Sequence, residues 1–513
     1  MRRLRKTCVA LSMAASLLQL PVGSAALAGT PPQDVGQSRG SAQQTSDVTA
    51  QPNVPQNLAS YFIDPAGEKQ VSQKQLISLL KKHIKYVFVI FNENHSFDHE
   101  YGTFPGVNGI YSDGSKPRSA ANTPGFNQTY TDNVSGATVT VQPFRLGPGQ
   151  NSSVMDSIDH SNTGMIAKYD VVNGVPQMDG YSKREYQRFA GASGTPAAAA
   201  QEEGTQFARL VMSHVDCDTI PFFWQYASRF TVFDNIFATE DGPSTPNAVA
   251  MLAGQMGQTQ WVKHPYSNAS QSVSSGGLTY TLAGPPLTGD PQPFWGSGLD
   301  LTPGNNSGKP PYVRQPLGAR GAELPASGPY SVSASLTFAS LPLTFQGKKV
   351  GDVLAKDPNY SEDAADIEMD IPYIQKFGSQ PVNWGWFQEG YGLEATDTGG
   401  VASHNSYVSH HNGAQYFGYI SNTPGITASM HGLTDFFTDM TNNSLPAGGV
   451  FYIRGGYTDQ KGKTAVVTDS NTPADEIAAI KAAKSGDDDH PSYTDRQLSE
   501  AMAARVINAV ASN

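Results

Sequence analysis

A continuous apolar run over residues 86–91 constrains the fold of this chain more than any other feature. The run, Tyr86-Val-Phe-Val-Ile-Phe91, contains no charged or amide residue, which is typical of a strand buried on both faces of a parallel sheet. It ends abruptly in Asn92, Glu93 and Asn94. Because α/β folds place their chemistry at the carboxyl ends of such strands, these polar residues are the first candidate site.

Other periodic segments predict helices and strands along the rest of the chain. Helical spacing extends over residues 68–84, 207–230, 248–254, 433–440 and 494–511, and strand-like runs extend over 230–233, 278–282, 330–338, 382–387 and 449–453. Residues 260–345 are dense in Gly, Pro, Ser and Asn, so we interpret them as an insertion around a site.

The first 57 residues are expected to lie outside the folded domain. A basic start, a short apolar stretch and the cleavage sequence Ala26-Leu27-Ala28 predict a signal peptide over residues 1–28. The polar composition of residues 29–57 predicts a disordered linker. We therefore expect export to the periplasm or the extracellular space, with no integral membrane segment after cleavage. Arg2-Arg3 leaves both twin-arginine and ordinary Sec export open.

Charge and cysteine content narrow the classes of partner. The chain has 34 Lys and Arg residues against 45 Asp and Glu residues, for a net charge of -11. Such a chain is a poor binder of nucleic acid through its general field, so a phosphate-bearing substrate requires a local binding device. Without the signal peptide, Cys217 is the remaining cysteine, and we expect a buried structural thiol there rather than a disulfide.

Two segments carry the residue types that phosphate chemistry needs. Glu93 and Asn94 offer hard oxygen ligands for a divalent cation, although the same residues can also cap the next helix. In Gly242-Pro-Ser-Thr-Pro-Asn247, Pro246 suits the first turn of a helix whose amide groups would face a phosphoryl group at Ser244. A nearby metal would activate the hydroxyl as a nucleophile, while the alternative is that Ser244 is only a cap.

Three histidines add to these candidates. His160 follows an acidic segment, His411 precedes Asn412, and His490 follows the run Asp487-Asp488-Asp489. Imidazole groups near a phosphoryl site can bind its oxygens or protonate the leaving alcohol. A lone histidine is more often structural, so the functional interpretation depends on these side chains converging in space.

Residues 92–107 resemble the ENRSFDHYFGT-P-G signature of the bacterial phosphoesterase family, which includes acid phosphatases and non-specific phospholipases C. Phe230-Thr-Val-Phe-Asp-Asn-Ile-Phe237 and the Gly242–Asn247 segment resemble two further family segments, FTxFDNxF and GP[ST]xPN. Shorter matches at residues 156–160, 177–180 and 383–389 follow in family order, so the resemblance covers roughly residues 85 to 513. The wording of the first motif leans to the acid phosphatase branch.

The resemblance implies an alkaline-phosphatase-like α/β fold over residues 58–513, with a central, mostly parallel sheet sandwiched by helices. It also implies hydrolysis that depends on a divalent metal ion and passes through a phosphoenzyme. Matched by position, Glu93 and Asn94 correspond to metal ligands, Ser244 to the nucleophile, and His160 and His490 to histidines at the phosphate; Asn94 would also touch the phosphate. His411 is a weaker match to the family pattern.

One departure from the family pattern concerns the end of the sequence. In the family, the helix corresponding to residues 494–511 precedes a strand that ends in paired carboxylates of the form TYDE or TWDD, whereas this sequence stops at Asn513. The resemblance therefore implies that the C-terminal part of the sheet and one half of the metal site are missing. Asp487, Asp488 and Asp489 are not expected to replace that pair.

Three functional hypotheses remain open. The first is an exported phosphatase acting on small phosphate monoesters, and the second is a phospholipase C acting on a choline phospholipid. The second needs a pocket for a quaternary ammonium group, for which Trp384, Trp386 and Tyr391 are candidates, although we expect these side chains in the core. The third is an inactive protein that binds phosphate esters without turnover.

Overall fold

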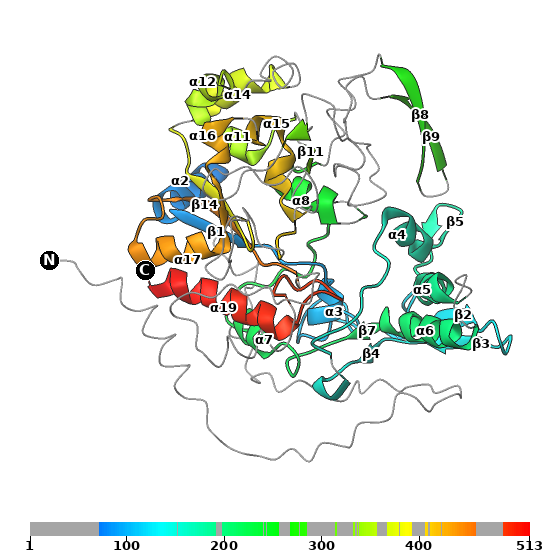
Figure 1. Ribbon diagram of the computed structural model, residues 1–513. Helices are drawn as coiled ribbons and strands as arrows, with labels where there is room; N and C mark the ends of the chain where they lie inside the picture. The colour runs from blue at the N-terminus through cyan, green and yellow to red at the C-terminus, as the bar shows by residue number, and fades with distance from the viewer. Residues whose placement is uncertain are drawn as a thin grey trace, which may run out of the picture.

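The protein was analysed as a computed structural model, and Figure 1 shows its arrangement. The structure describes residues 71–150, 152–190, 197–239, 241–242, 244–255, 267–275, 278–284, 313–314, 332–333, 336, 338–356, 367–378, 380–391, 406–408, 411–421, 423–457 and 486–512. The predicted signal peptide and linker, and most of the predicted insertion, lie outside these ranges.

A four-stranded parallel sheet forms the centre of the fold. Its spatial order is β1-β14-β12-β13, with β1 at Tyr86–Ile90, β12 at Trp384–Gln388, β13 at Met430–Gly432 and β14 at Gly449–Arg454. Three of these strands were predicted from their apolar runs, while β13 was not, because three residues carry too little periodicity. The order places β1 beside β14, so segments from opposite ends of the chain adjoin.

Side chains alternate between the two faces of the sheet and build two separate cores. On β14, Tyr452 packs with Trp384 and Trp386 in one core, while Phe451 and Ile453 lie in the other. Helices α17 (Leu433–Asn442) and α19 (Arg496–Ser512) cover the second face. The first face is covered by α8 (Ser244–Ala253), α11 (Leu341–Phe345), α12 (Val350–Leu354), α14 (Asp370–Phe377), α15 (Gly418–Ser421) and α16 (Pro424–Thr427). This arrangement gives the three layers visible in Figure 1.

The remaining elements surround this sandwich. The other helices are α2 (Gln73–His83), α3 (Phe97–Tyr101), α4 (Asn162–Tyr169), α5 (Tyr181–Phe189), α6 (Ala197–Leu210) and α7 (Pro221–Ala227), with 3-10 helices η2 (Pro148–Gln150), η3 (Gly347–Lys349) and η5 (Gly413–Tyr416).

Short strands pair outside the central sheet. They are β2 (Gln128–Thr131) with β3 (Thr138–Val141), β4 (Phe144–Arg145) with β7 (Ser213–His214), β5 (Val171–Val172) with β6 (Val175–Pro176), β8 (Ser267–Ser275) with β9 (Leu278–Gly284), and β10 (Val313–Arg314) with β11 (Val332–Ser333). Strands β9 and β11 fall where short strands were predicted inside the insertion.

Several predictions on local structure were wrong. β1 is an edge strand with Tyr86 and Val87 exposed, so it is not buried on both faces. The helix predicted over 207–230 is interrupted, because α6 ends at Leu210, β7 follows, and Pro221 begins the separate helix α7.

Two further corrections concern the segments on either side of α7. No strand forms over the described residues 230–233, and Phe233 is exposed, because this segment gains no neighbouring strand. Cys217 is half-buried rather than buried. Within the described part of the chain, no helix is both long enough and apolar enough to cross a bilayer.

Candidate functional site

The candidate site lies at the carboxyl edge of the central sheet, where the chemistry of parallel sheets is expected. Strand β1 runs into Asn92 and Glu93, and the neighbouring β14 ends at Arg454. The backbone N–H of Glu93 donates to the carbonyl of Asp488 at 3.0 Å, which joins a third segment to these two. Sequence-distant residues therefore meet in one buried cluster.

Glu93 is the centre of this cluster. One carboxylate oxygen, Oε1, contacts Nε2 of His411 and accepts a hydrogen bond from the Tyr457 hydroxyl at 3.3 Å. The other, Oε2, lies 3.2 Å from Nη2 of Arg454. On its opposite side, the His411 ring places Nδ1 at 2.9 Å from Oδ2 of Asp488.

The charges around Glu93 decide its protonation. Burial alone raises the pKa of this carboxyl group, but His411 and Arg454 outweigh burial and hold the pKa well below its usual range. For Asp488, burial dominates: its pKa lies well above the usual range, with Arg454 opposing the shift and Glu93 adding to it. Glu93 is therefore the ionised member of the pair.

The cluster has the composition of a metal site. Glu93, His411 and Asp488 each offer one ligand atom, and these three atoms lie within 4.8 Å of one another. Oδ1 of Asp488 is buried and lies 3.1 Å from Nε of Arg454, an ion pair that does not have hydrogen-bond geometry. Two carboxylates and an imidazole suit Zn²⁺ or Mn²⁺, and the donor set therefore fits the divalent ion that the family implies.

Two of the other predicted histidines lie next to this cluster. Nε2 of His490 lies 3.9 Å from Oε1 of Glu93, and the ring centroids of His490 and His160 are 5.5 Å apart. In both rings Nδ1 faces a backbone carbonyl, at 2.7 Å from Pro491 for His490 and 2.9 Å from Ile158 for His160. This contact places the proton on Nδ1 and leaves Nε2 to exchange a proton with a ligand.

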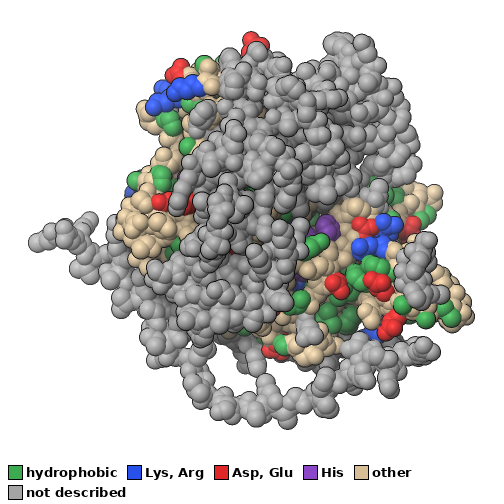
Figure 2. Space-filling view, in the orientation of Figure 1, with side chains coloured by type: hydrophobic (Ala, Val, Ile, Leu, Met, Phe, Trp, Pro, Cys, Tyr) green, Lys and Arg blue, Asp and Glu red, His purple; other side chains and the backbone are tan. Residues whose placement is uncertain are grey.

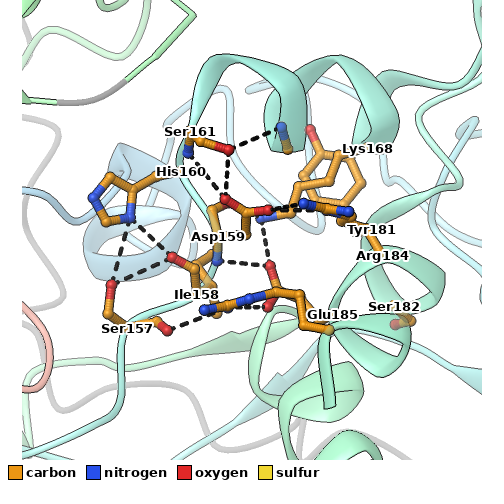
Figure 3. A network of polar contacts seen from close by, with 12 residues as sticks. Ser157, Ile158, Asp159, His160, Ser161, Lys168, Tyr181, Ser182, Arg184 and Glu185 are labelled. Carbon is orange, nitrogen blue, oxygen red and sulfur yellow. Dashed lines mark hydrogen bonds and ion pairs between the residues drawn. The ribbon is translucent and has the colours of Figure 1, made fainter. Parts of the chain in front are cut away.

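A network of buried charges holds the segment that carries His160 (Figure 3). Arg184 Nε donates to Oδ2 of Asp159 at 2.9 Å, and the backbone N–H of Asp159 donates to Glu185 at 2.8 Å. Lys168 and Arg188 pair with Glu185 at 2.7 Å and 2.6 Å. The residue directly before His160 is thereby fixed from α4 and α5.

The surface near this network carries both signs of charge. In Figure 2, basic and acidic side chains are interspersed on the part of this face that carries α4, α5 and α6. The described residues of this part of the face therefore carry charges of both signs.

Fewer contacts relate Ser244 and Asn94 to the cluster around Glu93. Ser244 is buried as the first residue of α8, and α8 packs against η5, which follows His411 by two residues. Pro246 lies in the first turn, as predicted. Among the described residues, no hydrogen bond or ion pair joins Ser244 to Glu93. Asn94 follows Glu93 and is half-buried. The chemical roles of both residues stay predictions.

Sequence reasoning missed three members of the cluster. Asp488 was set aside because it precedes His490 in a predicted loop, yet its backbone and side chain both reach the Glu93 and His411 segments. Arg454 ends a predicted strand and Tyr457 follows shortly after. Arg454 is 1% exposed, and a buried arginine at a strand end needs a carboxylate partner, which is the signal that points to it.

Comparison with known proteins points to one family. The model of the Phosphoesterase family matches residues 84–513. A non-hemolytic phospholipase C from Burkholderia pseudomallei (strain K96243) is 28% identical over 177 residues, which are 34% of this chain and 21% of that protein. The matched region thus spans about a fifth of the relative's length.

Proposed function

This chain belongs to the phosphoesterase family, and from that premise we propose that it is an exported, metal-dependent phosphatase that hydrolyses phosphate monoesters through a phosphoserine at Ser244. Hydrolysis of phosphoric esters follows from the family itself. The monoester substrate, the phosphoserine and the export are the additional content of the proposal. The observation that supports it best is the buried cluster of Glu93, His411 and Asp488 at the carboxyl edge of the sheet.

The proposed reaction has two displacements at phosphorus. The Ser244 hydroxyl oxygen forms a bond to phosphorus while the bond from phosphorus to the alcohol oxygen breaks, and the serine proton passes to a base. Nε2 of His160 or His490 then returns a proton to the leaving alcohol. Water attacks the phosphoserine, which releases inorganic phosphate and restores the hydroxyl group.

Two features of the site favour this chemistry. A divalent cation held by Glu93, His411 and Asp488, with the amide oxygen of Asn94 as a further ligand, supplies positive charge for the phosphoryl oxygens. The amino end of α8 presents backbone N–H groups beside Ser244. Both features bind phosphate locally, which suits a chain whose overall charge is negative.

A second candidate function is a phospholipase C activity on choline phospholipids. The observation in its favour is the similarity to the Burkholderia phospholipase C. The aromatic residues considered for an ammonium pocket argue against it, because Trp384, Trp386 and Tyr391 are 7%, 1% and 1% exposed and pack in the core. This leaves the monoester as the favoured substrate.

The test compares two substrates and one serine variant. The full chain is assayed with para-nitrophenyl phosphate and with phosphatidylcholine vesicles, in the presence of Mg²⁺, Mn²⁺, Zn²⁺ or Ca²⁺. Ser244→Ala is expected to reduce turnover of the aryl phosphate by about 10⁴-fold, whereas Ser135→Ala, in an exposed turn, leaves it unchanged.

Each outcome selects one hypothesis. Full activity of Ser244→Ala would exclude the phosphoserine. Faster turnover of phosphatidylcholine than of the monoester would select the phospholipase C. Metal binding without turnover of either substrate would select the third hypothesis, a binding protein without catalysis.

A further inference from the structure

A second group of ligand-type side chains, two of them buried and one half-buried, lies beside the candidate site. It consists of His95, Glu100 and Asp489, whose ligand atoms lie within 4.8 Å of one another. We propose that these three residues bind a second divalent cation, distinct from the one expected at Glu93, His411 and Asp488.

The two carboxyl groups of this group are buried, and each keeps one oxygen without a hydrogen-bond partner. Glu100 is 8% exposed and Asp489 is 6% exposed. Oε1 of Glu100 and Oδ1 of Asp489 have no hydrogen-bond partner. Two facing carboxylates that have lost water repel each other, so a proton or a cation must neutralise them. These unpartnered oxygens are the observation that points to a ligand.

The neighbouring arginine does not supply enough positive charge. Nε of Arg496 lies 3.9 Å from Oε1 of Glu100, which is an ion pair without a hydrogen bond. Its Nη2 is directed to nitrogen atoms of His99 and His95, at 2.6 Å and 2.7 Å. One guanidinium group thus stands against two carboxylates, and its donors are used mainly by the histidines.

His95 has the properties of a ligand. Nη2 of Arg496 lies 2.7 Å from Nδ1 of His95, and because a guanidinium group only donates, the ring nitrogen that faces it accepts and carries a lone pair. One ring nitrogen hydrogen-bonds to the backbone of Asp489, which fixes the tautomer and leaves a lone pair on the other nitrogen. A cation would compete with Arg496 for that lone pair, and His99 remains as a partner for the guanidinium group.

The alternative occupant is a proton shared by the two carboxyl groups. The side chains of Glu100 and Asp489 lie within hydrogen-bond reach of each other, which is the geometry that a shared proton needs. A proton bridging the pair would satisfy both oxygens without His95. The imidazole at the same point is what favours a cation, since a ring nitrogen adds nothing to a shared proton.

The donor set also limits which cation fits. Ca²⁺ requires six to eight oxygen ligands, and Mg²⁺ keeps most of its waters, so neither matches a buried site with one nitrogen ligand. Two carboxylates and one imidazole suit Zn²⁺ or Mn²⁺, with a water completing the coordination.

Such a cation would join the two loops that build the candidate site. Glu100 lies on α3, directly after the loop that carries Glu93 and Asn94. Asp489 lies between Asp488 and His490, in the loop that precedes α19. Binding at this second group would therefore fix the spacing of Glu93 and Asp488 without contacting the substrate.

The test counts Zn²⁺ ions bound by the full chain, using isothermal titration calorimetry with Zn²⁺ alone. Wild type is expected to bind two equivalents. Glu100→Gln and Asp489→Asn are each expected to weaken one of the two sites by at least about 100-fold, and Glu93→Gln is expected to weaken the other. Glu203→Gln, an exposed carboxylate on α6, is the matched control and should retain both.

Several outcomes would overturn the proposal. They are a single equivalent in wild type that Glu100→Gln leaves unchanged, no Zn²⁺ binding in wild type, or loss of both equivalents in Glu93→Gln alone. A shared proton predicts the first pattern. Because Glu100→Gln should keep the Glu93 site, the remaining equivalent also reports that this variant is folded.

A second measurement uses the histidine. Co²⁺ bound through His95 should contribute a part of the visible absorption that is lost in His95→Ala and kept in His83→Ala, an exposed histidine on α2, while the part due to Co²⁺ at His411 remains in both variants. The proposal stands apart from the phosphoserine, because Ser244→Ala should abolish turnover while both Zn²⁺ equivalents remain.

Discussion

Two pairs of carboxylates in this protein, all buried except the half-buried Asp159, differ in how their charge is compensated. Asp159 and Glu185 face three cations, Lys168, Arg184 and Arg188, and Figure 3 shows the first two beside the carboxylates. Glu100 and Asp489 face Arg496 at a longer distance and keep buried oxygens without hydrogen bonds. The first pair is a finished structural network, whereas the second is built for an additional positive charge.

The Glu93 cluster lies between these two cases. Arg454 and His411 keep Glu93 ionised, and Oδ1 of Asp488 is paired with Nε of Arg454 at 3.1 Å but without hydrogen-bond geometry. The comparison teaches that burial of a carboxylate does not by itself indicate function; an incomplete set of partners does. Four substitutions test this distinction, and they are ordered by the size of the expected effect.

The largest effect is expected where the carboxylate is needed for chemistry. Glu93→Gln should reduce hydrolysis of para-nitrophenyl phosphate by about 10³-fold or more, because a neutral amide holds a cation far less well. Steady-state kinetics measure this, with Glu203→Gln as control. Unchanged activity would remove Glu93 from the site.

A substitution in the network around Asp159 and Glu185 should instead lower the stability of the folded protein. Glu185→Gln leaves the buried Lys168 ammonium group without its carboxylate partner, which should lower the free energy of unfolding by about 4 kcal/mol. Chemical denaturation followed by fluorescence gives this value. A Zn²⁺ stoichiometry that falls along with stability would show that the network is also a metal site, contrary to the comparison.

An effect of intermediate size on stability is expected at the buried carboxyl group of Glu500. Burial raises the pKa of Glu500 from 4.5 to about 8, although its Oε1 accepts a hydrogen bond from the N–H of Phe223 at 2.7 Å. The unfolded chain loses this proton above pH 4.5 while the folded chain keeps it until about pH 8. Stability should therefore fall as pH rises between these values and level off above them.

Glu500→Gln should remove that fall, which amounts to about 3.5 kcal/mol between pH 5 and pH 8. Unfolding midpoints at pH 5 and pH 8 provide the measurement. If wild type and variant have equal slopes, Glu500 is ionised in the folded protein and the argument from burial is wrong for this group.

The smallest effect is expected at an exposed ion pair. Asp218 has a side chain that is 63% exposed and lies 2.6 Å from Nη2 of Arg145. Water and salt screen such pairs, so Asp218→Asn should cost about 0.5 kcal/mol or less. A loss above about 2 kcal/mol would mean that exposure is a poor guide to the value of a charge here.

Local patterns predicted much of the fold. The runs that became β1, β12 and β14 and the helical spacing of α17 and α19 were correct, because each element follows from side chains that are neighbours in the sequence. Pro221 was overlooked inside a long periodic segment, so α6 and α7 were merged into one helix. The exposure of β1 could not be predicted, since it depends on which strands adjoin it.

The residues of the candidate site also fall into those that the local sequence revealed and those that it did not. Glu93 was visible in the sequence because a charged residue directly after an apolar strand is unusual. Asp488 and Arg454 were not, because their significance comes from contacts with residues far away in the chain. The same is true of Glu100 and Asp489, which stand in an ordinary helix and an ordinary acidic run.

The sequence by itself determined the family, the main strands and helices, and the residue types available for phosphate chemistry. All of these depend on residues that are close together in the sequence. Tertiary structure alone decided which carboxylates are paired and which are left with unsatisfied oxygens. The physical reason is that the cost of a buried charge depends on everything within a few ångströms, and those neighbours are assembled only when the sheet brings distant segments to one edge.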